Sequence, residues 1–324
     1  MMLLEPRHRG RVVNAARGLL LGLVGFWALL ASNAAHAESD APFLWQVKGA
    51  KATHYLLGSV HLLPSAAGRL PTGIVQAYRS ADALVFESDI DALQGRKLSA
   101  QMLEAATAPK GIAAEIDVGT MRRLRQRMRA LRMPTAQCET YRPWFCALSL
   151  ELYAYQRAGF SGEYGLDRRL HDAALADGRT MAWFEAPERH IALFTDMAKP
   201  LSTQFLDAAL ADNGLKAEEP VEMYRAWRNN DSSGIEALIA EMKHDYPAVY
   251  EHLLAGRNRA WLPELKRRLK LPERQLIVVG AAHWLGPDGL IASLTAAGYQ
   301  VRPYLAIDID QKAGLELDAV IAHR

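Results

Sequence analysis

The sequence predicts an α/β (α+β) fold in which a central mixed sheet is flanked by helices. Half of the 324 residues are hydrophobic and 23% are charged, as in a globular chain with a sizeable core. Short apolar runs typical of buried strands lie among longer stretches with helical periodicity. No linker rich in Gly, Ser or Pro and no tandem repeat divides the chain. We therefore expect one domain over residues 38–324, with its core at about 42–305.

The strands are predicted from apolar runs with polar boundaries. Residues 43–47 are expected to form an edge strand, and buried strands follow at 53–60, 83–86, 180–184 and 275–279. A last strand at 299–305 is expected to close the sheet after a helix at 287–297. Apolar residues recur with helical spacing in five further segments, at 121–133, 141–157, 166–176, 187–197 and 253–269.

The N-terminus has the pattern of a secretory signal peptide. Residues 1–17 hold four arginines, residues 19–30 are continuously apolar, and small residues lead to Ala37. We therefore expect cleavage after Ala37 and a periplasmic or secreted mature protein. The apolar run has 12 residues, whereas a helix needs about 20 to cross a bilayer, so no stable membrane span is expected after cleavage. An uncleaved anchor is the alternative.

The charge balance excludes a dedicated nucleic-acid binder. The net charge is +2 for the whole chain and becomes −1 when residues 1–37, with four arginines and one glutamate, are removed. Neither value supplies the basic surface that phosphate groups require. Six arginines surround the apolar face of the predicted helix 121–133. We expect a solvated face there, and binding of an acidic glycan or an anionic lipid is the alternative.

Cys138 and Cys146 are the only cysteines, which excludes a disulfide-rich scaffold and a zinc site of four thiolates. On one straight helix, eight residues would separate them by about 12 Å, too far for a disulfide. Pro143 lies between them and could bend the chain, and an exported protein meets oxidising conditions. The sequence leaves the disulfide open.

Titratable side chains directly follow four of the predicted strands. Glu87 and Glu185 each end an apolar run, and His61 and His283 each end the pattern Gly-x-x-His. Glycine permits a sharp exit from a strand, and ligand clefts lie at strand ends in α/β proteins. The repeated pattern predicts two pseudo-equivalent halves of one sheet, each of which contributes a histidine.

Two imidazoles with one or two carboxylates form a suitable ligand set for Mn, Fe, Co or Zn. Such an ion polarises a carbonyl group and lowers the pKa of bound water. A glutamate that does not bind the ion could act as general base. The alternative is structural: each histidine caps its strand by hydrogen bonding, and each glutamate pairs with an arginine.

Other catalytic motifs are weak or missing from the sequence. There is no Gly-x-Ser-x-Gly nucleophile motif, no phosphate-binding loop and no dinucleotide-binding fingerprint. Ser59, between Gly58 and His61, is expected to have a packing role. Arg257 and Asn258 lie on the predicted helix before His283, where they could orient a substrate or hold the helix against the sheet.

Several segments, in the same order, resemble the TraB/PrgY/GumN family. Residues 55–64 are similar to its opening motif, residues 85–87 to its second motif and residues 278–290 to its closing motif. Pro143-Trp144, Gly165-Leu166-Asp167, Trp183-Phe184-Glu185 and Arg257-Asn258 resemble landmarks between these motifs. The resemblance covers about residues 42–305 and is greatest to the GumN-like bacterial branch.

The resemblance implies the fold of the TIKI proteins, which are membrane-tethered metal-dependent proteases. It also implies an active site of His61, Glu87 and His283, supported by Mn or Co. We add Glu185 to these three as a further expected metal ligand. Mn or Co is the expected ion, followed by Zn.

The expected function is that of an exported metal-dependent hydrolase, a metallopeptidase, that acts on a peptide or protein substrate. Arg257 and Asn258 are the expected substrate-binding residues. The alternative is a non-catalytic periplasmic protein that binds haem or a metal, or that assists polysaccharide export.

Overall fold

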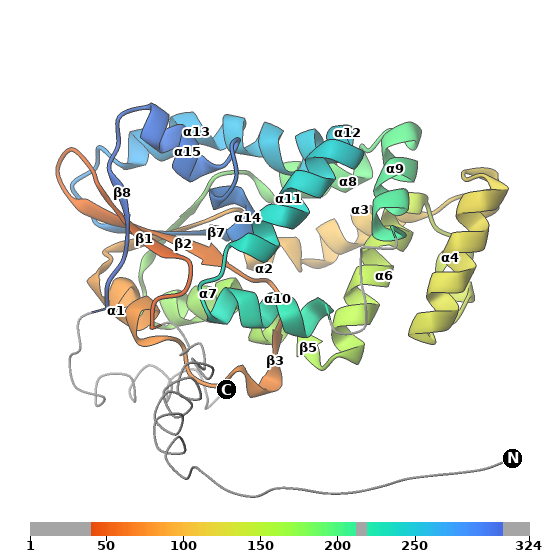
Figure 1. Cartoon of the computed structure of the whole chain (residues 1–324), viewed down its shortest axis with the longest axis horizontal. Helices are drawn as coiled ribbons and strands as arrows, with labels where there is room; N and C mark the ends of the chain where they lie inside the picture. The colour runs from red at the N-terminus through yellow and green to blue at the C-terminus, as the bar shows by residue number, and fades with distance from the viewer. Residues whose placement is uncertain (1–39, 212–218, 307–324) are drawn as a thin grey trace, which may run out of the picture. The chain divides into compact units, whose positions relative to one another are not determined.

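The structure is a computed structural model that describes residues 40–211 and 219–306. A six-stranded mixed sheet flanked by helices forms its centre, which confirms the predicted fold class (Figure 1). The predicted signal peptide, residues 1–37, lies outside the described residues. In spatial order the strands are β6 (Thr180–Trp183), β4 (Ala83–Phe86), β7 (Gln275–Gly280), β2 (Thr53–Ser59), β1 (Leu44–Lys48) and β8 (Val301–Pro303).

Helices make up most of the remaining described chain. Helices that share a core with the sheet include α1 (Thr72–Ser80), α7 (Leu166–Ala176), α10 (Glu219–Arg228), α11 (Ser233–Asp245), α13 (Gly256–Arg268), α14 (Ala281–Trp284) and α15 (Leu290–Ala296). The remaining described helices are α2 (Ile90–Leu93), α3 (Arg96–Ala106), α4 (Val118–Leu131), α5 (Ala136–Glu139), α6 (Pro143–Arg157), α8 (Pro187–Thr195), α9 (Lys199–Ala209) and α12 (Pro247–Tyr250). A π-helical turn (Glu251–Ala255) precedes α13, and the short strands β3 (Leu63–Pro64) and β5 (Phe160–Ser161) pair with each other.

Four of the predicted strands run parallel to one another. β4 pairs with β6 on one side and with β7 on the other, and β7 pairs with β2. Apolar runs such as β4 and β7 are typical of parallel strands whose two faces are both covered. The prediction of a buried strand at 180–184 was wrong, because β6 lies at the edge of the sheet and none of its residues is fully buried. β1 extends the sheet as an antiparallel neighbour of β2. The prediction of an edge strand at 43–47 was wrong, because β8 pairs with the outer side of β1, with Val47 opposite Val301.

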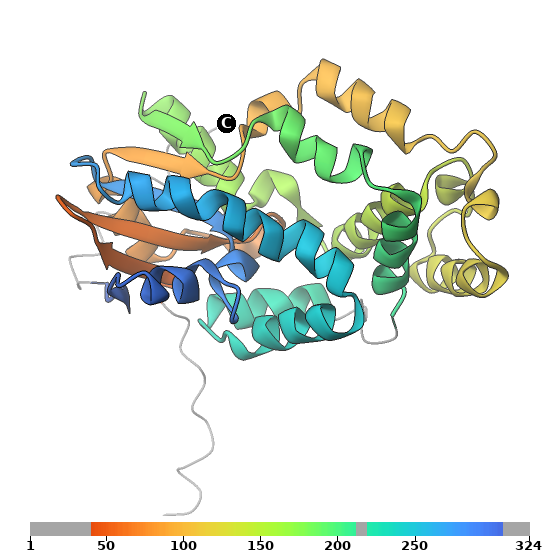
Figure 2. The ribbon, with the colours of Figure 1, turned by 90° about the horizontal axis from the view of Figure 1, so that it is seen from above.

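Neighbouring side chains along each strand pack into different cores, because successive residues point to opposite faces of a sheet. Leu57 and Val278 belong to the core beneath α1 and α7. Leu56 and Ile277 belong to the core beneath α13 and α15. Figures 1 and 2 show α13 and α15 together on one side of the sheet.

A third core holds α4, α5, α6 and α9 together, away from the sheet. Here the predicted helix 121–133 is observed as α4, which begins earlier because the Asp117 carboxylate accepts the backbone N–H groups of Gly119 and Thr120. The helix ends at Leu131 because Arg132 has a left-handed φ of 55°. No helix within residues 40–211 and 219–306 is long and apolar enough to cross a membrane.

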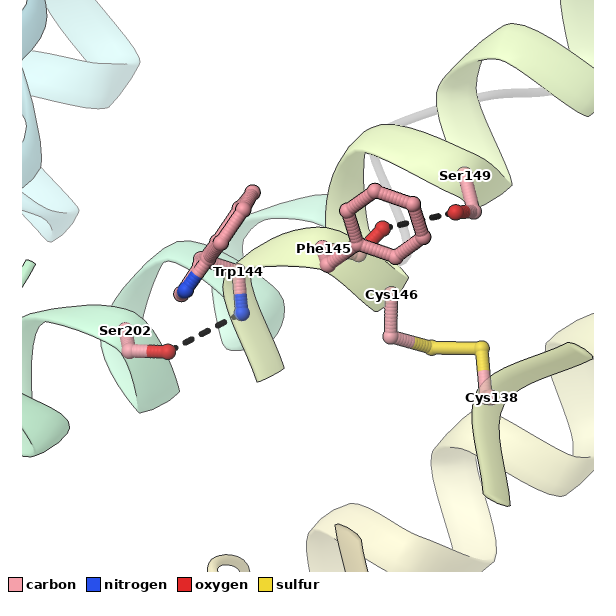
Figure 3. The surroundings of a disulfide bond; sticks show 6 residues. All are labelled: Cys138, Trp144, Phe145, Cys146, Ser149 and Ser202. Carbon is pink, nitrogen blue, oxygen red and sulfur yellow. Dashed lines mark hydrogen bonds between the residues drawn. A yellow bond between two sulfur atoms is a disulfide. The ribbon is translucent and has the colours of Figure 1, made fainter. Parts of the chain in front are cut away.

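Cys138 and Cys146 form a disulfide in this helical core (Figure 3). Their Cα atoms are 5.3 Å apart, because the chain turns between α5 and α6 and the two residues do not share one straight helix. Pro143 takes the first position of α6, where a proline is tolerated. The structure thus decides the pairing that the sequence left open.

Candidate functional site

His61 and His283 leave the sheet at the same end, because β2 and β7 are parallel neighbours. They approach one carboxylate beside Gly280. A Cβ atom at Gly280 would lie 3.3 Å from Glu87 Oε1, 3.6 Å from His61 Nε2 and 3.7 Å from His283 Cδ2. Three side chains from distant parts of the sequence therefore surround one point, and a residue without a side chain leaves that point open.

The two Gly-x-x-His motifs are related but not equivalent in position. Ser59, not Gly58, pairs with Gly280 across the β2–β7 ladder. A Cβ atom at Gly58 would lie 3.0 Å from Phe43 Cβ, so this glycine permits close packing of the backbone. Gly280 instead faces the site. The two motifs place their histidines at the same end of the sheet, but Gly58 is needed for backbone packing and Gly280 leaves space at the site.

His283 is buried and held as a neutral imidazole. Asn258 Nδ2 donates to the backbone oxygens of Asp288 (2.9 Å) and His283 (3.3 Å), so Asn258 Oδ1 accepts from His283 Nδ1 at 2.6 Å. The lone pair of His283 Nε2 then faces Arg257, whose Nη1 lies 3.2 Å away. Burial, aided by the charge of Arg257, lowers the pKa of His283 to about 4.

His61 lies in a more open position, with 60% of its side chain exposed. Its Nδ1 is 3.1 Å from Asp167 Oδ2, and the negative charge of Asp167 raises the pKa of His61 to about 9. A metal ion binds the neutral imidazole, so binding at His61 would release a proton. Asp167 can reach His61 because Gly165 has no side chain: a Cβ atom there would lie only 2.3 Å from the His61 carbonyl oxygen, so only glycine lets the two backbone segments lie this close. The sequence indicated Asp167 only as a family landmark.

Arg257 links the two glutamates. Its Nη2 donates to Glu87 Oε2 at 2.7 Å and to Glu185 Oε1 at 2.6 Å, and its guanidinium lies 4.4 Å above the Trp261 ring. Burial raises the pKa of Glu87, but Arg257, the two histidines and the Gly280 N–H together outweigh it, and the pKa stays well below its usual range. The expected structural alternative is thus realised for both carboxylates, since each pairs with an arginine.

Glu185 has further partners that the sequence did not reveal. His190 Nδ1 donates to Glu185 Oε1 at 2.8 Å, and Trp261 Nε1 donates to Oε2 at 3.3 Å. His190 follows Glu185 on the next helix, α8, and no strand-end pattern marks it. One ligand atom each from Glu87, Glu185 and His190 lie within 4.8 Å of one another, so this group could hold a metal ion. The Arg257 guanidinium already lies between its two carboxylates.

A second donor set lies on the other side of Glu87. Glu87 Oε1 accepts the N–H of Gly280 at 2.7 Å and lies 3.9 Å from His283 Nε2, and His61 Nε2 is adjacent to the same point. Both histidines have Nδ1 held by an oxygen acceptor, from Asp167 and Asn258, which is the usual outer-shell arrangement of metal-binding histidines. Nitrogen and oxygen donors of this kind are the ones that divalent transition metals bind, but Arg257 Nη1, 3.2 Å from His283 Nε2, would have to move before an ion could use that nitrogen.

Arg257 and Asn258 contact other residues of the site in this structure. Asn258 is 2% exposed and uses its side chain to hold His283, and Arg257 uses its guanidinium on Glu87, Glu185 and His283. Substrate binding by either residue stays a prediction.

Comparison with known proteins agrees with the motif arrangement. The uncharacterized protein YbaP of Escherichia coli (strain K12) is 24% identical over 236 residues, which cover 73% of this chain and 85% of YbaP. YbaP of Shigella flexneri matches with the same identity and coverage. No solved structure matches. The model of the TraB/PrgY/gumN family matches residues 43–303, which include both histidines, Glu87, Glu185 and Arg257. The chain therefore belongs to the TraB/PrgY/gumN family.

Proposed function

We propose that this protein is an exported metal-dependent hydrolase that cleaves peptide bonds, with Mn or Co as its ion. One observation supports this most: two histidines from separate motifs present Nε2 to the same carboxylate while their Nδ1 atoms are held by Asp167 and Asn258. A histidine that only capped its strand would not need this paired outer shell.

The residues divide into ligands and supports. His61, His283 and Glu87 would hold the ion, which would polarise the substrate carbonyl and lower the pKa of a bound water. Arg257 holds Glu87 in its ionised form, and Glu185, which pairs with the same guanidinium, is the further candidate ligand. Asn258 keeps the proton of His283 on Nδ1, so that Nε2 remains free of a proton.

Export is part of the proposal. Residues 1–37 have the pattern of a signal peptide, and the Cys138–Cys146 disulfide is of a kind that persists in oxidising compartments. The mature protein would then act in the periplasm or outside the cell.

The metal content of the purified protein tests the proposal. Wild type, His61→Ala and His283→Ala would be loaded with Mn, Co or Zn, dialysed and measured by elemental mass spectrometry, and each would be incubated with a peptide library. His244→Ala is the matched control, since His244 is exposed and pairs only with Asp245 among the described residues. We expect near-stoichiometric metal and peptide cleavage in wild type and control, and loss of both in the two site variants.

Two results would contradict the proposal. One is the absence of bound metal under every loading condition, and the other is equal metal and cleavage in all four proteins. A Soret band on addition of haem, abolished by either site variant, would instead support the non-catalytic haem-binding alternative.

A further inference from the structure

A cavity of about 590 Å³ adjoins the histidine site. His61, His283 and Gly280 form part of its lining, so it opens directly onto the atoms that surround Glu87 Oε1. The volume lies within the range of clefts that bind small ligands. A group held in this cavity would therefore be next to a bond undergoing hydrolysis.

Two apolar helix stripes form part of its wall. Leu148, Leu152 and Tyr155 recur at helical spacing along α6, and Met223 and Trp227 do so along α10. Such stripes normally pack on each other, but these line a cavity, and Leu152 remains 45% exposed. Figure 1 labels both helices. Trp227 Nε1 donates to the Gly58 carbonyl oxygen at 2.9 Å, so the only polar atom of its side chain is used within the protein.

Charged groups are scarce in this lining. Apart from the two histidines, Glu151 is the only ionisable lining residue other than tyrosine among residues 40–211 and 219–306. A charged substrate group would lose its hydration in such surroundings, and away from the histidine end the described lining holds no lysine or arginine that could pair with an acidic group. This part of the cavity therefore favours an uncharged, apolar group.

One buried polar atom in the lining has no partner. Ser59 is 2% exposed, and its Oγ has no hydrogen-bond partner within the described chain. A buried hydroxyl without a hydrogen-bond partner lowers stability, so such atoms commonly bind a ligand or a water molecule. Ser59 lies two residues before His61, at the end of the cavity where the chemistry is proposed.

We propose that this cavity is the specificity subsite of the enzyme and accepts a large apolar side chain, such as Phe or Leu, of a peptide substrate. Ser59 Oγ hydrogen-bonds the substrate backbone beside that side chain. The inference rests on the proposed function and adds the substrate class. Met223 gives the wall a flexible surface that adapts to aromatic and branched aliphatic groups alike.

Binding and cleavage of matched peptides test the subsite. Short blocked alanine peptides with one central Phe, Leu, Ala or Asp would be titrated calorimetrically into metal-free and metal-loaded protein, and cleavage would be followed by mass spectrometry. We expect the Phe and Leu peptides to bind about tenfold or more tightly than the Ala and Asp peptides, since apolar pockets discriminate on this scale.

Variants inside and outside the cavity distinguish an effect on the cavity from a general effect of a charge on the protein surface. Leu152→Asp should abolish the preference, whereas Leu175→Asp, at a leucine 58% exposed on α7 and outside the cavity, should preserve it. Met223→Lys on the facing helix should act like Leu152→Asp, which guards against misfolding of one variant. Ser59→Ala should weaken the Phe peptide about five- to tenfold and leave the preference for Phe over Asp unchanged.

The outcomes distinguish this inference from the proposed function. Equal affinity for all four peptides, or a preference that survives both Leu152→Asp and Met223→Lys, overturns the subsite. A preference with the predicted variant pattern, but no cleavage by the metal-loaded protein, supports the subsite and contradicts the hydrolase. Cleavage of all four peptides without any preference supports the hydrolase and contradicts the subsite.

Discussion

Arg257 is the residue on which the buried charges of the site depend. Glu87 and Glu185 are 9% and 6% exposed, and both pair with the same guanidinium nitrogen. A buried carboxylate without a partner is far more costly than a paired one, because burial removes its hydration. Arg257 thus keeps Glu87 ionised and ready to bind a cation while no cation is bound.

Replacement of Arg257 by Leu should lower the free energy of unfolding by about 3–5 kcal/mol, since two buried carboxylates lose their partner. Urea unfolding at neutral pH measures the change. Arg259→Leu is the matched control on the same helix, because Arg259 and its partner Glu251 are both more than half exposed, and it should change stability little. Equal losses in the two variants would show that the buried pairing does not contribute as inferred.

Asn258 Oδ1 positions the imidazole of His283 through a hydrogen bond of 2.6 Å to Nδ1. Asn258→Leu should weaken metal binding about 10- to 100-fold, because nothing then fixes the proton on Nδ1. A competition titration with a chromophoric chelator measures the affinity, and circular dichroism checks that the variant is folded. Asn258→Asp, which keeps the acceptor oxygen, should retain most of the affinity. Unchanged affinity in Asn258→Leu would argue that Asn258 only holds the helix against the sheet.

At the scale of elements, the connection between α5 and α6 shows how a short loop changes a sequence-based conclusion. Cys138 lies in α5 and Cys146 in α6. The eight-residue spacing would exclude a disulfide only if both cysteines were on one continuous helix. Trp144, directly after Pro143, donates its backbone N–H to Ser202 Oγ at 2.9 Å, which ties the start of α6 to α9 (Figure 3). The disulfide adds a covalent link at the same place.

Removal of the disulfide should destabilise the helical core without dismantling the histidine site. The chain-entropy estimate for so short a loop is about 2.5 kcal/mol. A Cys138→Ala/Cys146→Ala double variant should lose about this much free energy of unfolding and still bind metal. Dithiothreitol should shift the unfolding midpoint of wild type toward that of the double variant and leave the double variant unaffected. A wild-type midpoint that is insensitive to complete reduction would refute the estimate.

At the scale of the whole molecule, stability should depend on pH through His54. This residue is fully buried in β2, and its Nδ1 accepts the backbone N–H of Gln275 at the start of β7. Burial lowers the pKa of His54 below its ordinary value of 6.5. Protonation would place a second donor against the Gln275 N–H, so the folded protein resists it.

The sign follows from linkage. The unfolded chain takes up a proton at His54 near pH 6.5, and the folded chain does so only at lower pH, so stability falls as the pH drops below about 6.5. From pH 7.5 to 5.5, wild type should lose free energy of unfolding relative to His54→Gln, which keeps an uncharged acceptor, by no more than about 1.4 kcal/mol per pH unit. Urea unfolding at both pH values gives the difference. A gap between the two proteins that does not change with pH would rule out His54 as the source.

Much of the fold could be predicted because its signals are local. The strands at 53–60, 83–86 and 275–279 are found within a residue or so of their predicted bounds, since continuous apolar runs specify strands buried on both faces. The place of β1 could not be predicted, because it depends on pairing with β8, some 250 residues further along the chain. Helix ends shifted where a side-chain cap, such as Asp117, decided them.

The sequence by itself determined which side chains follow the strands: His61, Glu87, Glu185 and His283 were all identifiable from the residues before them. Only the tertiary structure decided which of them meet and what holds them. Asp167 and the central position of Arg257 depend on contacts between segments about 70 to 170 residues apart, for which no local pattern exists. His190 is only five residues from Glu185, but it becomes part of the site only because Glu185 lies beside Glu87. Strand formation is a property of a short segment, whereas the site is a property of strand order and of parallel register, and these are decided by packing of the whole sheet.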